Sequence, residues 1–279
     1  MRRLVLWTLL PLLAIACEEE KQKPPASPGQ EDSKPAAKAV ETTKDSKPIP
    51  DDWPPRHAQD GTRIARERMV EGQIERRGVS DKDVLRAMGA VPRHEFVPLN
   101  RRRQAYEDRP LPIGWDQTIS QPYIVASMTE EIAVRKGMKV LELGTGSGYQ
   151  AAVLGQITPW VFTIEIKEPL AKRARGTLDK LGYTSVKSRR GDGYYGWPEE
   201  APFDAIIVTA AAPHVPPPLV KQLKPGGCMI IPVGPPMRVQ DLRLITKDAQ
   251  GRVKSKSLYA VRFVPLTGSL GKDSETKAD

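Results

Sequence analysis

The stretch Met138-Lys-Val-Leu-Glu-Leu-Gly-Thr-Gly-Ser-Gly-Tyr-Gln150 decides the fold of this chain. It begins with an apolar run that is typical of a buried strand, and a helical pattern follows from Tyr149 to Gln156. Between them stand three glycines at alternate positions, Gly144, Gly146 and Gly148. Glycine has no Cβ, so the backbone can turn tightly here and a ligand can approach its N–H groups. The stretch therefore predicts a strand, a ligand-binding turn and a helix.

The spacing of these glycines separates two classes of cofactor. The dinucleotide fingerprint G-x-G-x-x-G requires glycine at position 149, where this chain has Tyr149. The pattern here is G-x-G-x-G, preceded by an acidic residue, and it is typical of methyltransferases that bind S-adenosylmethionine (SAM). A carboxylate beside the turn suits the cationic amine of SAM and would repel a pyrophosphate. We therefore expect SAM as the cofactor, bound by Glu142, Gly144, Thr145, Gly146, Ser147 and Gly148.

The N-terminal part of the 279-residue chain differs in composition from the rest. Arg2 and Arg3 precede an apolar stretch, and small residues lead to Cys17, which predicts a lipoprotein-type signal peptide over residues 1–17 with lipidation at Cys17. An ordinary signal peptide or an incorrect start codon is the alternative. Residues 18–60 are rich in Pro, Lys and Glu and predict a disordered tether. We expect a membrane anchor facing the periplasm or the exterior, or a cytoplasmic protein if the signal is not used.

Charge and cysteine content exclude several other functions. The formal net charge is +9, but the basic clusters at 101–103 and 189–190 have no aromatic residues interleaved with them, so we expect no nucleic-acid partner. The chain has only two cysteines, Cys17 and Cys228, which excludes a disulfide framework and a cysteine-based zinc site. Cys228 lies in an apolar run and is expected in the core. We expect a monomer without a metal site.

Helical and strand patterns alternate from residue 61 onward. An amphipathic helix is predicted over 62–77, ending at Gly78, and Ser80 is expected to cap a second helix. Strands are predicted at 139–143, 161–166, 185–190, 204–209, 229–233, 242–247 and 257–265. Apolar strands separated by helices predict a doubly wound, mostly parallel, Rossmann-like α/β sheet behind an N-terminal helical segment. This domain is expected over 61–268, with a polar tail at 269–279.

Acidic residues stand at the ends of three successive predicted strands. In an open α/β sheet, ligands bind beyond the carboxyl ends of the strands. Glu165, followed by Ile166, ends the second strand and can accept hydrogen bonds from ribose hydroxyls. Asp192, followed by Gly193, comes after the third strand and could accept one from an adenine amino group, although an aspartate in this setting is more often a turn former. With Glu142 of the first strand, these residues predict a cofactor site.

The segment Gln117-Thr-Ile-Ser-Gln-Pro-Tyr123 is the second informative stretch. Pro122 suits the first turn of a helix, so Ser120 or Gln121 is expected at the helix N-cap. From these residues alone, the favoured interpretation is that Ser120 only caps this helix. The alternative is that its hydroxyl, the free N–H groups and the helix dipole attract a carboxylate.

With these motifs the chain resembles the protein-L-isoaspartate O-methyltransferases over roughly residues 62–267. The Thr-Ile-Ser-Gln-Pro and Val-Arg-Phe-Val-Pro-Leu segments are more specific to this family than the glycine turn. The signal peptide and the tether depart from the usual family pattern. The matching stretches are Ala90–Val97, Leu111–Gly114, Gln117–Tyr123, Val140–Gln150, Gly191–Gly193, Gly196-Trp197, Ala201–Ala212 and Ala260–Leu266.

The resemblance implies a class I SAM-dependent methyltransferase that methylates the α-carboxylate of L-isoaspartyl residues in damaged proteins and peptides. Ser120 stands at the position of the family's active-site serine, which makes it the expected catalytic residue. A carboxylate is already ionised near pH 7, so no general base is expected. The alternative is a catalytically weak or inactive membrane-tethered module that binds SAM or isoaspartyl residues. The expected substrate-binding residues are Thr118, Ile119, Ser120, Val264, Pro265, Leu266 and Thr267, and the last four would pair with the substrate backbone.

Overall fold

Residues 53–55 and 61–269 are described in a computed structural model of the chain. The expected signal peptide with the lipidation site Cys17, the tether at 18–52 and 56–60, and the tail from residue 270 lie outside the described residues. Among the described helices, none has the length and apolar character needed to cross a membrane.

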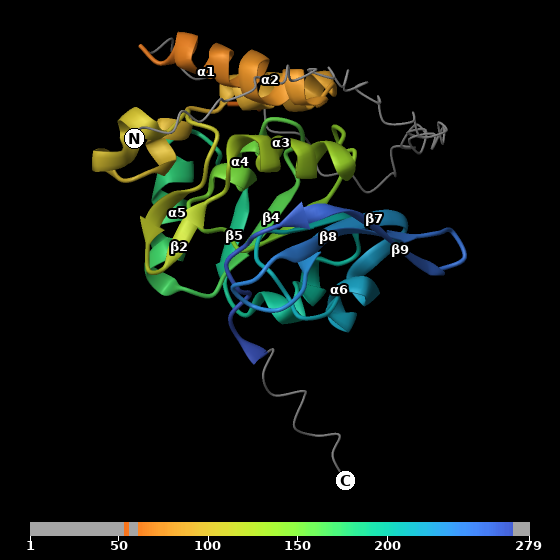
Figure 1. The fold of residues 1–279 in the computed structure, drawn as a ribbon. Coiled ribbons are helices and arrows are strands. Elements are labelled where there is room, and N and C mark those ends of the chain that lie inside the picture. The colour runs from red at the N-terminus through yellow and green to blue at the C-terminus, as the bar shows by residue number, and fades with distance from the viewer. Residues whose placement is uncertain (1–52, 56–60, 270–279) are drawn as a thin grey trace, which may run out of the picture. The chain divides into compact units, whose positions relative to one another are not determined.

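A seven-stranded sheet forms the centre of the domain (Figure 1). Its strand order is β5-β4-β3-β6-β7-β8-β9, parallel from β5 to β7 and antiparallel at β8 and β9. The chain changes direction across the sheet between β3 and β6, which is where open α/β sheets bind ligands. The strands are β3 (Val140–Leu143), β4 (Val161–Glu165), β5 (Lys187–Arg190), β6 (Phe203–Val208), β7 (Leu223–Val233), β8 (Gln240–Lys247) and β9 (Val253–Val261).

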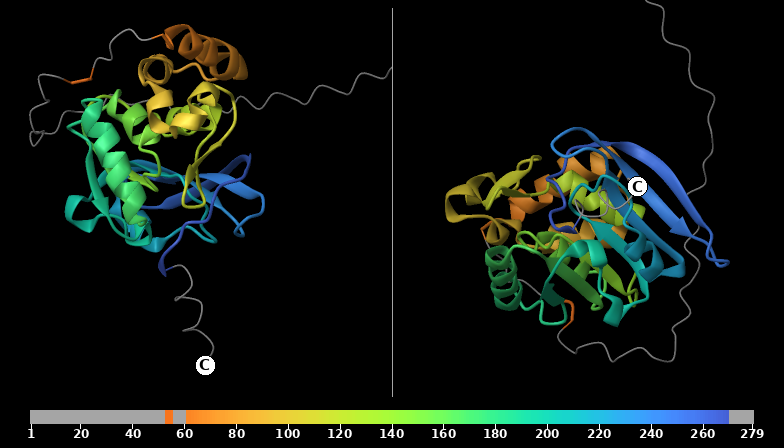
Figure 2. Two further views of the ribbon diagram at one scale, coloured as in Figure 1. Left: turned by 90° about the vertical axis from the view of Figure 1, so that its left-hand side faces the viewer. Right: turned by 90° about the horizontal axis from the view of Figure 1, so that it is seen from below.

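Helices cover both faces of this sheet (Figures 1 and 2). Along β6, Ala205 and Ile207 join a core with α1 to α5, whereas Ile206 and Val208 join a second core with Leu219 of α6. This alternation confirms the predicted doubly wound, mostly parallel α/β fold. The α-helices are α1 (Arg63–Met69), α2 (Lys82–Ala90), α3 (Pro122–Glu131), α4 (Tyr149–Gly155), α5 (Glu168–Lys180) and α6 (Pro217–Gln222). A π-helical segment spans Val70–Ile74, and 3-10 helices span Glu75–Arg77, Arg93–Phe96, Leu99–Gln104, Gly193–Tyr195 and Pro198–Glu200.

The N-terminal helical segment differs from the prediction at its cap. The chain is helical to Arg77 and leaves the helix at Gly78, where φ is +100°, as expected. The second helix is capped by Asp81 and not by Ser80, because the Asp81 carboxylate accepts hydrogen bonds from the N–H groups of Asp83 and Val84. The Ser80 N–H donates instead to Glu130 of α3. The expectation for Ser80 was therefore wrong by one residue.

A small β-hairpin that the sequence did not predict precedes Ser120. It consists of β1 (Leu111–Gly114) and β2 (Gln117–Ile119), which pair antiparallel. Trp115 and Asp116 form its turn with φ values of +51° and +57°, the left-handed pair that a two-residue hairpin of this type requires. Asn-Gly or Asp-Gly usually signals such a turn, and Trp-Asp does not. The hairpin places Ser120 directly after a strand and before α3.

Part of the expected tether packs against the domain. The indole N–H of Trp53 donates to the carbonyl of Gly155 at 2.7 Å, and Gln156 donates to the carbonyl of Pro55 at 2.8 Å. The prediction of disorder over the whole of 18–60 was therefore wrong at residues 53–55. An indole offers apolar area and a donor together, which explains why this residue can be held. Since α4 begins at the glycine turn and ends at Gly155, the contact lies at the end of α4 that is far from that turn.

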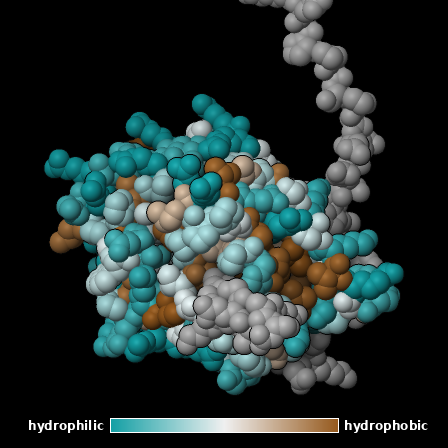
Figure 3. Space-filling view, turned by 60° about the horizontal axis from the view of Figure 1, so that its bottom comes forward, coloured by the Kyte–Doolittle hydropathy of each residue, from teal (hydrophilic) through white to brown (hydrophobic). Residues whose placement is uncertain are grey.

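On the face shown in Figure 3, hydrophilic residues surround several apolar areas. Single apolar residues on a surface are normal, and only contiguous patches suggest an interaction site. Val239, more than half exposed, also lines a cavity beside Ser120. The exposed large apolar side chains of the described part include Ile64, Leu99, Trp115, Tyr195, Met237, Val239 and Val253.

Candidate active site

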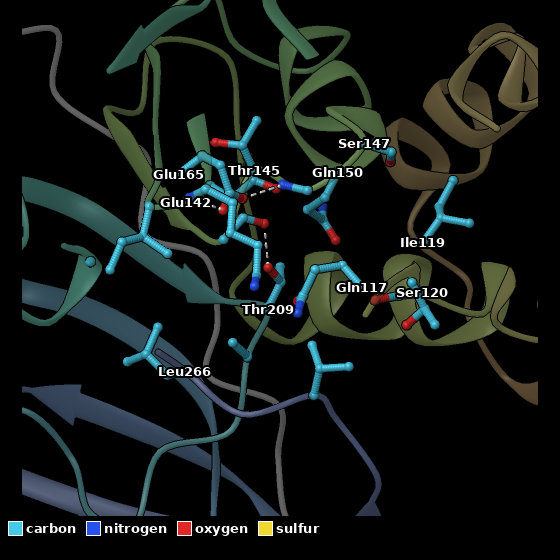
Figure 4. A pocket seen from close by; sticks show the side chains of 18 of the residues that line it. Gln117, Ile119, Ser120, Glu142, Thr145, Ser147, Gln150, Glu165, Thr209 and Leu266 are labelled. Carbon is cyan, nitrogen blue, oxygen red and sulfur yellow. Dashed lines mark hydrogen bonds between the residues drawn. The ribbon is translucent and has the colours of Figure 1, made fainter. Parts of the chain in front are cut away.

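A cavity opens at the carboxyl ends of β3, β4 and β6, where the fold predicts a ligand. Figure 4 shows Glu142, Thr145 and Glu165 on one side of it, and Ile119 and Ser120 on the other. Of the residues predicted for the cofactor and the substrate, all line this cavity except Gly148 and Asp192. The sequence analysis missed further lining residues: Gln117, Val125, Tyr149, Gln150, Ile164, Lys167, Thr209 and Ala210.

The glycine turn has the backbone that the sequence predicted. Gly144, Gly146 and Gly148 all have positive φ, of +93°, +54° and +89°. A Cβ on Gly144 would lie 2.6 Å from the Thr209 hydroxyl oxygen, which donates to the carbonyl of Gly144. Only glycine fits at that position. Gly148 is the N-cap of α4 and packs against α5, so it shapes the turn without lining the cavity.

Glu142 is fully buried and has one carboxylate oxygen without a partner. The Thr163 hydroxyl donates to Oε2 at 2.6 Å, and the Thr145 hydroxyl lies 2.6 Å from Thr163, completing a short chain of hydroxyls. Oε1 of Glu142 is buried and accepts no hydrogen bond from the described residues. Burial raises the pKa of this carboxyl to about 8. A buried oxygen of this kind beside a cavity fits a cationic amine, which is the group expected of SAM.

Glu165 braces the glycine turn from the end of β4. Its Oε2 accepts the N–H of Gly146 at 2.8 Å, and its Oε1 accepts the N–H of Lys167 at 2.9 Å. Each carboxylate oxygen can accept a second hydrogen bond, and the side chain lines the cavity. Both oxygens therefore remain able to receive the two hydroxyls of a ribose.

Asp192 does not line the cavity, although its neighbour Gly193 does. Oδ1 of Asp192 accepts the N–H of Tyr194, and Oδ2 accepts both the N–H and the hydroxyl of Ser269 at 2.8 Å. This aspartate therefore caps a short turn, which is the ordinary role of the residue. The same contact makes Ser269, which the sequence assigned to the polar tail, a packed part of the domain.

Ser120 does not cap α3. The N-cap of that helix is Gln121, and no side chain caps it. The Ser120 hydroxyl makes no hydrogen bond to any described residue, while its carbonyl accepts one from Arg93 at 2.7 Å. The side chain lines the cofactor cavity and a second cavity beside it. The interpretation of Ser120 as a cap is therefore wrong, and its hydroxyl is available to a ligand.

The second cavity, of about 520 Å³, adjoins the first through Thr118, Ser120, Thr209 and Val264. Residues 259–264, which include the end of β9, line it together with Arg77 and Tyr123. The strand β9 is an edge strand of the sheet. An extended peptide can lie against such an edge, so this cavity offers an acceptor groove next to Ser120.

The segment Val264–Thr267 lines the cofactor cavity, but the fold already uses part of its backbone. The N–H of Ala211 donates to the carbonyl of Val264, and the N–H of Leu266 donates to the carbonyl of Ala211, both at 2.8 Å. The N–H of Leu266 is thus occupied, whereas the carbonyl of Val264 can still accept a second hydrogen bond. These bonds fix the segment as a wall of the cavity, and the pairing of its other backbone groups with a substrate stays a prediction.

Comparison with known proteins agrees with this arrangement. The family model for protein-L-isoaspartate(D-aspartate) O-methyltransferase (PCMT) matches residues 64–271. A protein-L-isoaspartate O-methyltransferase 2 of Polaromonas sp. is 59% identical over 188 residues, which are 67% of this chain and 89% of that protein. A protein-L-isoaspartate O-methyltransferase 1 of Nitrosospira multiformis is 58% identical over 205 residues, 73% of this chain and 87% of that protein.

Solved structures give the same result. A protein-L-isoaspartate O-methyltransferase matches with a TM-score of 0.66 and 33% identity, over 74% of this chain and 67% of that one. A putative protein-L-isoaspartate O-methyltransferase of Plasmodium falciparum in complex with S-adenosyl-L-homocysteine matches with a TM-score of 0.63 and 26% identity, over 72% and 98%. None of these relatives supports the alternative of an inactive binding module. The chain belongs to the protein-L-isoaspartate(D-aspartate) O-methyltransferase family.

Proposed function

We propose that this chain transfers a methyl group from SAM to the α-carboxylate of L-isoaspartyl residues in damaged proteins and peptides. The observation that carries this function is the position of Ser120, whose unpartnered hydroxyl lines both the cofactor cavity and the acceptor groove. The methyl ester carries methoxide as its leaving group, which departs far more readily than the oxygen of a free carboxylate. The neighbouring backbone nitrogen then attacks the ester, methanol leaves, and the resulting succinimide hydrolyses in part to normal aspartate.

The chemistry required of the protein is positioning. Bound SAM supplies a methyl group on a positively charged sulfur. The acceptor carboxylate is ionised at pH 7, so no side chain has to remove a proton. Neither cavity has a histidine or cysteine among its lining residues, which is consistent with a reaction that needs no base or nucleophile. Ser120 orients the carboxylate by donating a hydrogen bond, and the walls of the two cavities exclude water.

The side chains that would hold the cofactor have hydrogen-bonding capacity that the fold does not use. Glu142 presents its buried, unpartnered Oε1 to the amine, and Glu165 offers the second lone pairs of its carboxylate to the ribose. The glycine turn lets the cofactor approach the backbone closely. On the acceptor side, Thr118, Ile119 and the wall at 264–267 would confine the substrate next to Ser120.

The test uses the purified full-length protein, SAM and a synthetic peptide with one isoaspartyl residue. Mass spectrometry should find one methyl ester, located by fragmentation at the α-carboxylate of that residue. On standing, part of the peptide should return to the normal aspartyl form. Methylation at another side chain, or none, would refute the proposed function.

We also propose that residues 1–17 direct the protein to a membrane as a lipoprotein attached through Cys17, with the enzyme on the periplasmic or outer side. The support is the order of Arg2, Arg3, the apolar stretch and Cys17. In a bacterial host, the protein should incorporate labelled fatty acid and sediment with membranes, and C17A should do neither. Equal labelling of both proteins, or an unlabelled soluble wild type, contradicts the proposal.

We propose that the enzyme acts as a monomer. The support is that residues of this one chain line both cavities. Sedimentation velocity of the purified protein should give a monomer at assay concentrations. An active species that is exclusively dimeric would contradict this.

A further inference from the structure

Arg93 is the largest fully buried side chain of the described residues. A buried guanidinium loses its hydration, so it is retained only where protein groups replace the water. Arg93 forms no ion pair with a described residue, and its Nη1 has no hydrogen-bond partner there. A charge buried in this way is costly. Its remaining donors must therefore hold groups that offset part of this cost.

The two donors that have partners join segments far apart in the chain. Nε donates to the carbonyl of Ala105 at 2.7 Å, and Nη2 donates to the carbonyl of Ser120 at 2.7 Å. The planar fork of an arginine fixes the relative position of two such carbonyls, which a lysine cannot do. Arg93 thus holds the backbone of Ser120 itself, while leaving the hydroxyl of that residue free.

Arg93 also contacts the cofactor side of the site. Its guanidinium lies over the ring of Tyr149, 4.7 Å from the ring centroid. Tyr149 is the first residue of α4, directly after the glycine turn, and it lines the cofactor cavity. Arg93 therefore contacts both Tyr149, which follows the glycine turn, and Ser120, which lines the acceptor groove.

A second anchor fixes the residues that follow Ser120. The carboxylate of Asp108 accepts hydrogen bonds from the side chain of Gln121 and the N–H of Tyr123, and it pairs with Arg77. Asp108 stands three residues after Ala105, whose carbonyl Arg93 holds. The start of α3 is thus held at two points, and Arg93 supplies the one at Ser120.

We propose that Arg93 is a positioning residue for methyl transfer, which sets the Ser120 hydroxyl relative to the cofactor turn. This inference rests on the proposed function, because it gives Arg93 a task in that reaction. In-line transfer between two bound groups depends steeply on their distance, and a shift of about 1 Å can cost about 100-fold in rate. Loss of the fork should therefore lower kcat without removing a contact to SAM.

The test compares R93K with R66K. Arg66 is the control because it is also buried, at 5% exposure, and donates to the carbonyl of Gly89 and the hydroxyl of Thr62, which line neither cavity. The Thr62 hydroxyl lies 3.1 Å from that of Tyr106, so R66K disturbs the neighbourhood of Arg93 while it leaves the Arg93 bond to Ser120 in place. R93K should lower kcat by about 10- to 100-fold, with the Kd for SAM within about threefold of wild type. R66K should lose a similar amount of thermal stability and keep its kcat. R93Q, which carries no charge to bury, repeats the measurement if R93K does not fold.

Hydrogen exchange supplies a readout that does not depend on activity. The peptide covering residues 117–123 should exchange faster in R93K than in wild type, and should be unchanged in R66K. An unchanged exchange rate in R93K, or equal kcat values for R93K and R66K, overturns the role of Arg93. If wild type itself fails to methylate an isoaspartyl peptide, the proposed function fails, and the exchange data still decide whether Arg93 holds the segment.

Discussion

Replacing Glu142 by glutamine tests the electrostatics of the cofactor site. Glutamine has the same shape, and its carbonyl oxygen can keep the hydrogen bond from Thr163. Its NH₂ group would stand where Glu142 has the unpartnered Oε1. E142Q therefore removes the negative charge and turns a donor toward the cationic amine of SAM, while it leaves the packing nearly unchanged.

The expected loss in affinity follows from two opposing contributions. A carboxylate and an ammonium about 4 Å apart attract each other by about 4 kcal/mol at an effective dielectric constant of about 20. Ionising a carboxyl whose pKa is about 8 costs about 1 kcal/mol at pH 7. The difference of about 3 kcal/mol corresponds to about a 100-fold weaker Kd for SAM in E142Q.

Isothermal titration calorimetry with SAM measures this effect directly. Because the pKa of free Glu142 is about 8, wild type should release a proton on binding below that pH, and its affinity should rise between pH 6 and pH 8. E142Q should show neither effect. E199Q is the control, since Glu199 is an exposed partner of Arg189 outside the cavity. A Kd for E142Q within about threefold of wild type, or the same pH dependence, would refute the assigned role of Glu142.

The same raised pKa predicts how the stability of the free protein depends on pH. The pKa of Glu142 is 4.5 for an ordinary carboxyl and about 8 in the fold. Below pH 4.5 the group is protonated in both states and has no effect. As the pH rises to 8, the unfolded chain ionises and the folded one does not, so the free energy of unfolding falls. Urea titrations without SAM should show this decline for wild type and its reduction for E142Q.

Three further substitutions test other parts of the account. S120A should lower kcat by about 10- to 100-fold with unchanged Tm and SAM affinity, because the hydroxyl has no partner in the described fold; an equal loss of stability and activity would support a cap. G144A should abolish SAM binding in calorimetry and cost more than about 1–2 kcal/mol in urea unfolding, because φ is +93° and the new Cβ meets Thr209; normal binding would contradict this. W53A should lose about 2 kcal/mol of stability in the same unfolding assay, through the bond to Gly155 and the ring contacts, with kcat unchanged; an unaltered stability would show that the contact is not formed in solution.

The parts of the fold that the sequence predicted are those with a strong local pattern. The apolar run of β3 and the glycines after it determine both a strand and a turn, because few other residues tolerate the φ values found there. The start of α3 was also placed correctly, since Pro122 suits the first helical turn. The alternation of strand and helix patterns was sufficient to predict all seven strands of the sheet. The start of β7 and both ends of β9 lie several residues before their predicted positions.

The parts that were missed depend on contacts between distant segments. Arg93 has no periodic neighbours that would mark it, and its role follows from carbonyls at Ala105 and Ser120. Asp192 matched a cofactor pattern, but it forms the local turn that the sequence analysis named as its more common role, through the N–H of Tyr194. Its contact with Ser269 joins residues 77 positions apart, and no local pattern contains it. Trp53 stands in a segment whose composition predicts disorder. The hydrogen bond from its indole N–H to the carbonyl of Gly155 fixes it against the domain.

The most direct test of the central claim is a comparison of two peptides that differ only in one linkage. The full-length protein is given labelled SAM and either an isoaspartyl peptide or its normal aspartyl twin, and kcat/KM is measured for each. Both peptides carry an ionised carboxylate, so only the position of that group relative to Ser120 distinguishes them. We predict label on the isoaspartyl peptide and none above background on its twin. Equal transfer to both peptides, or no transfer to either, would contradict the account.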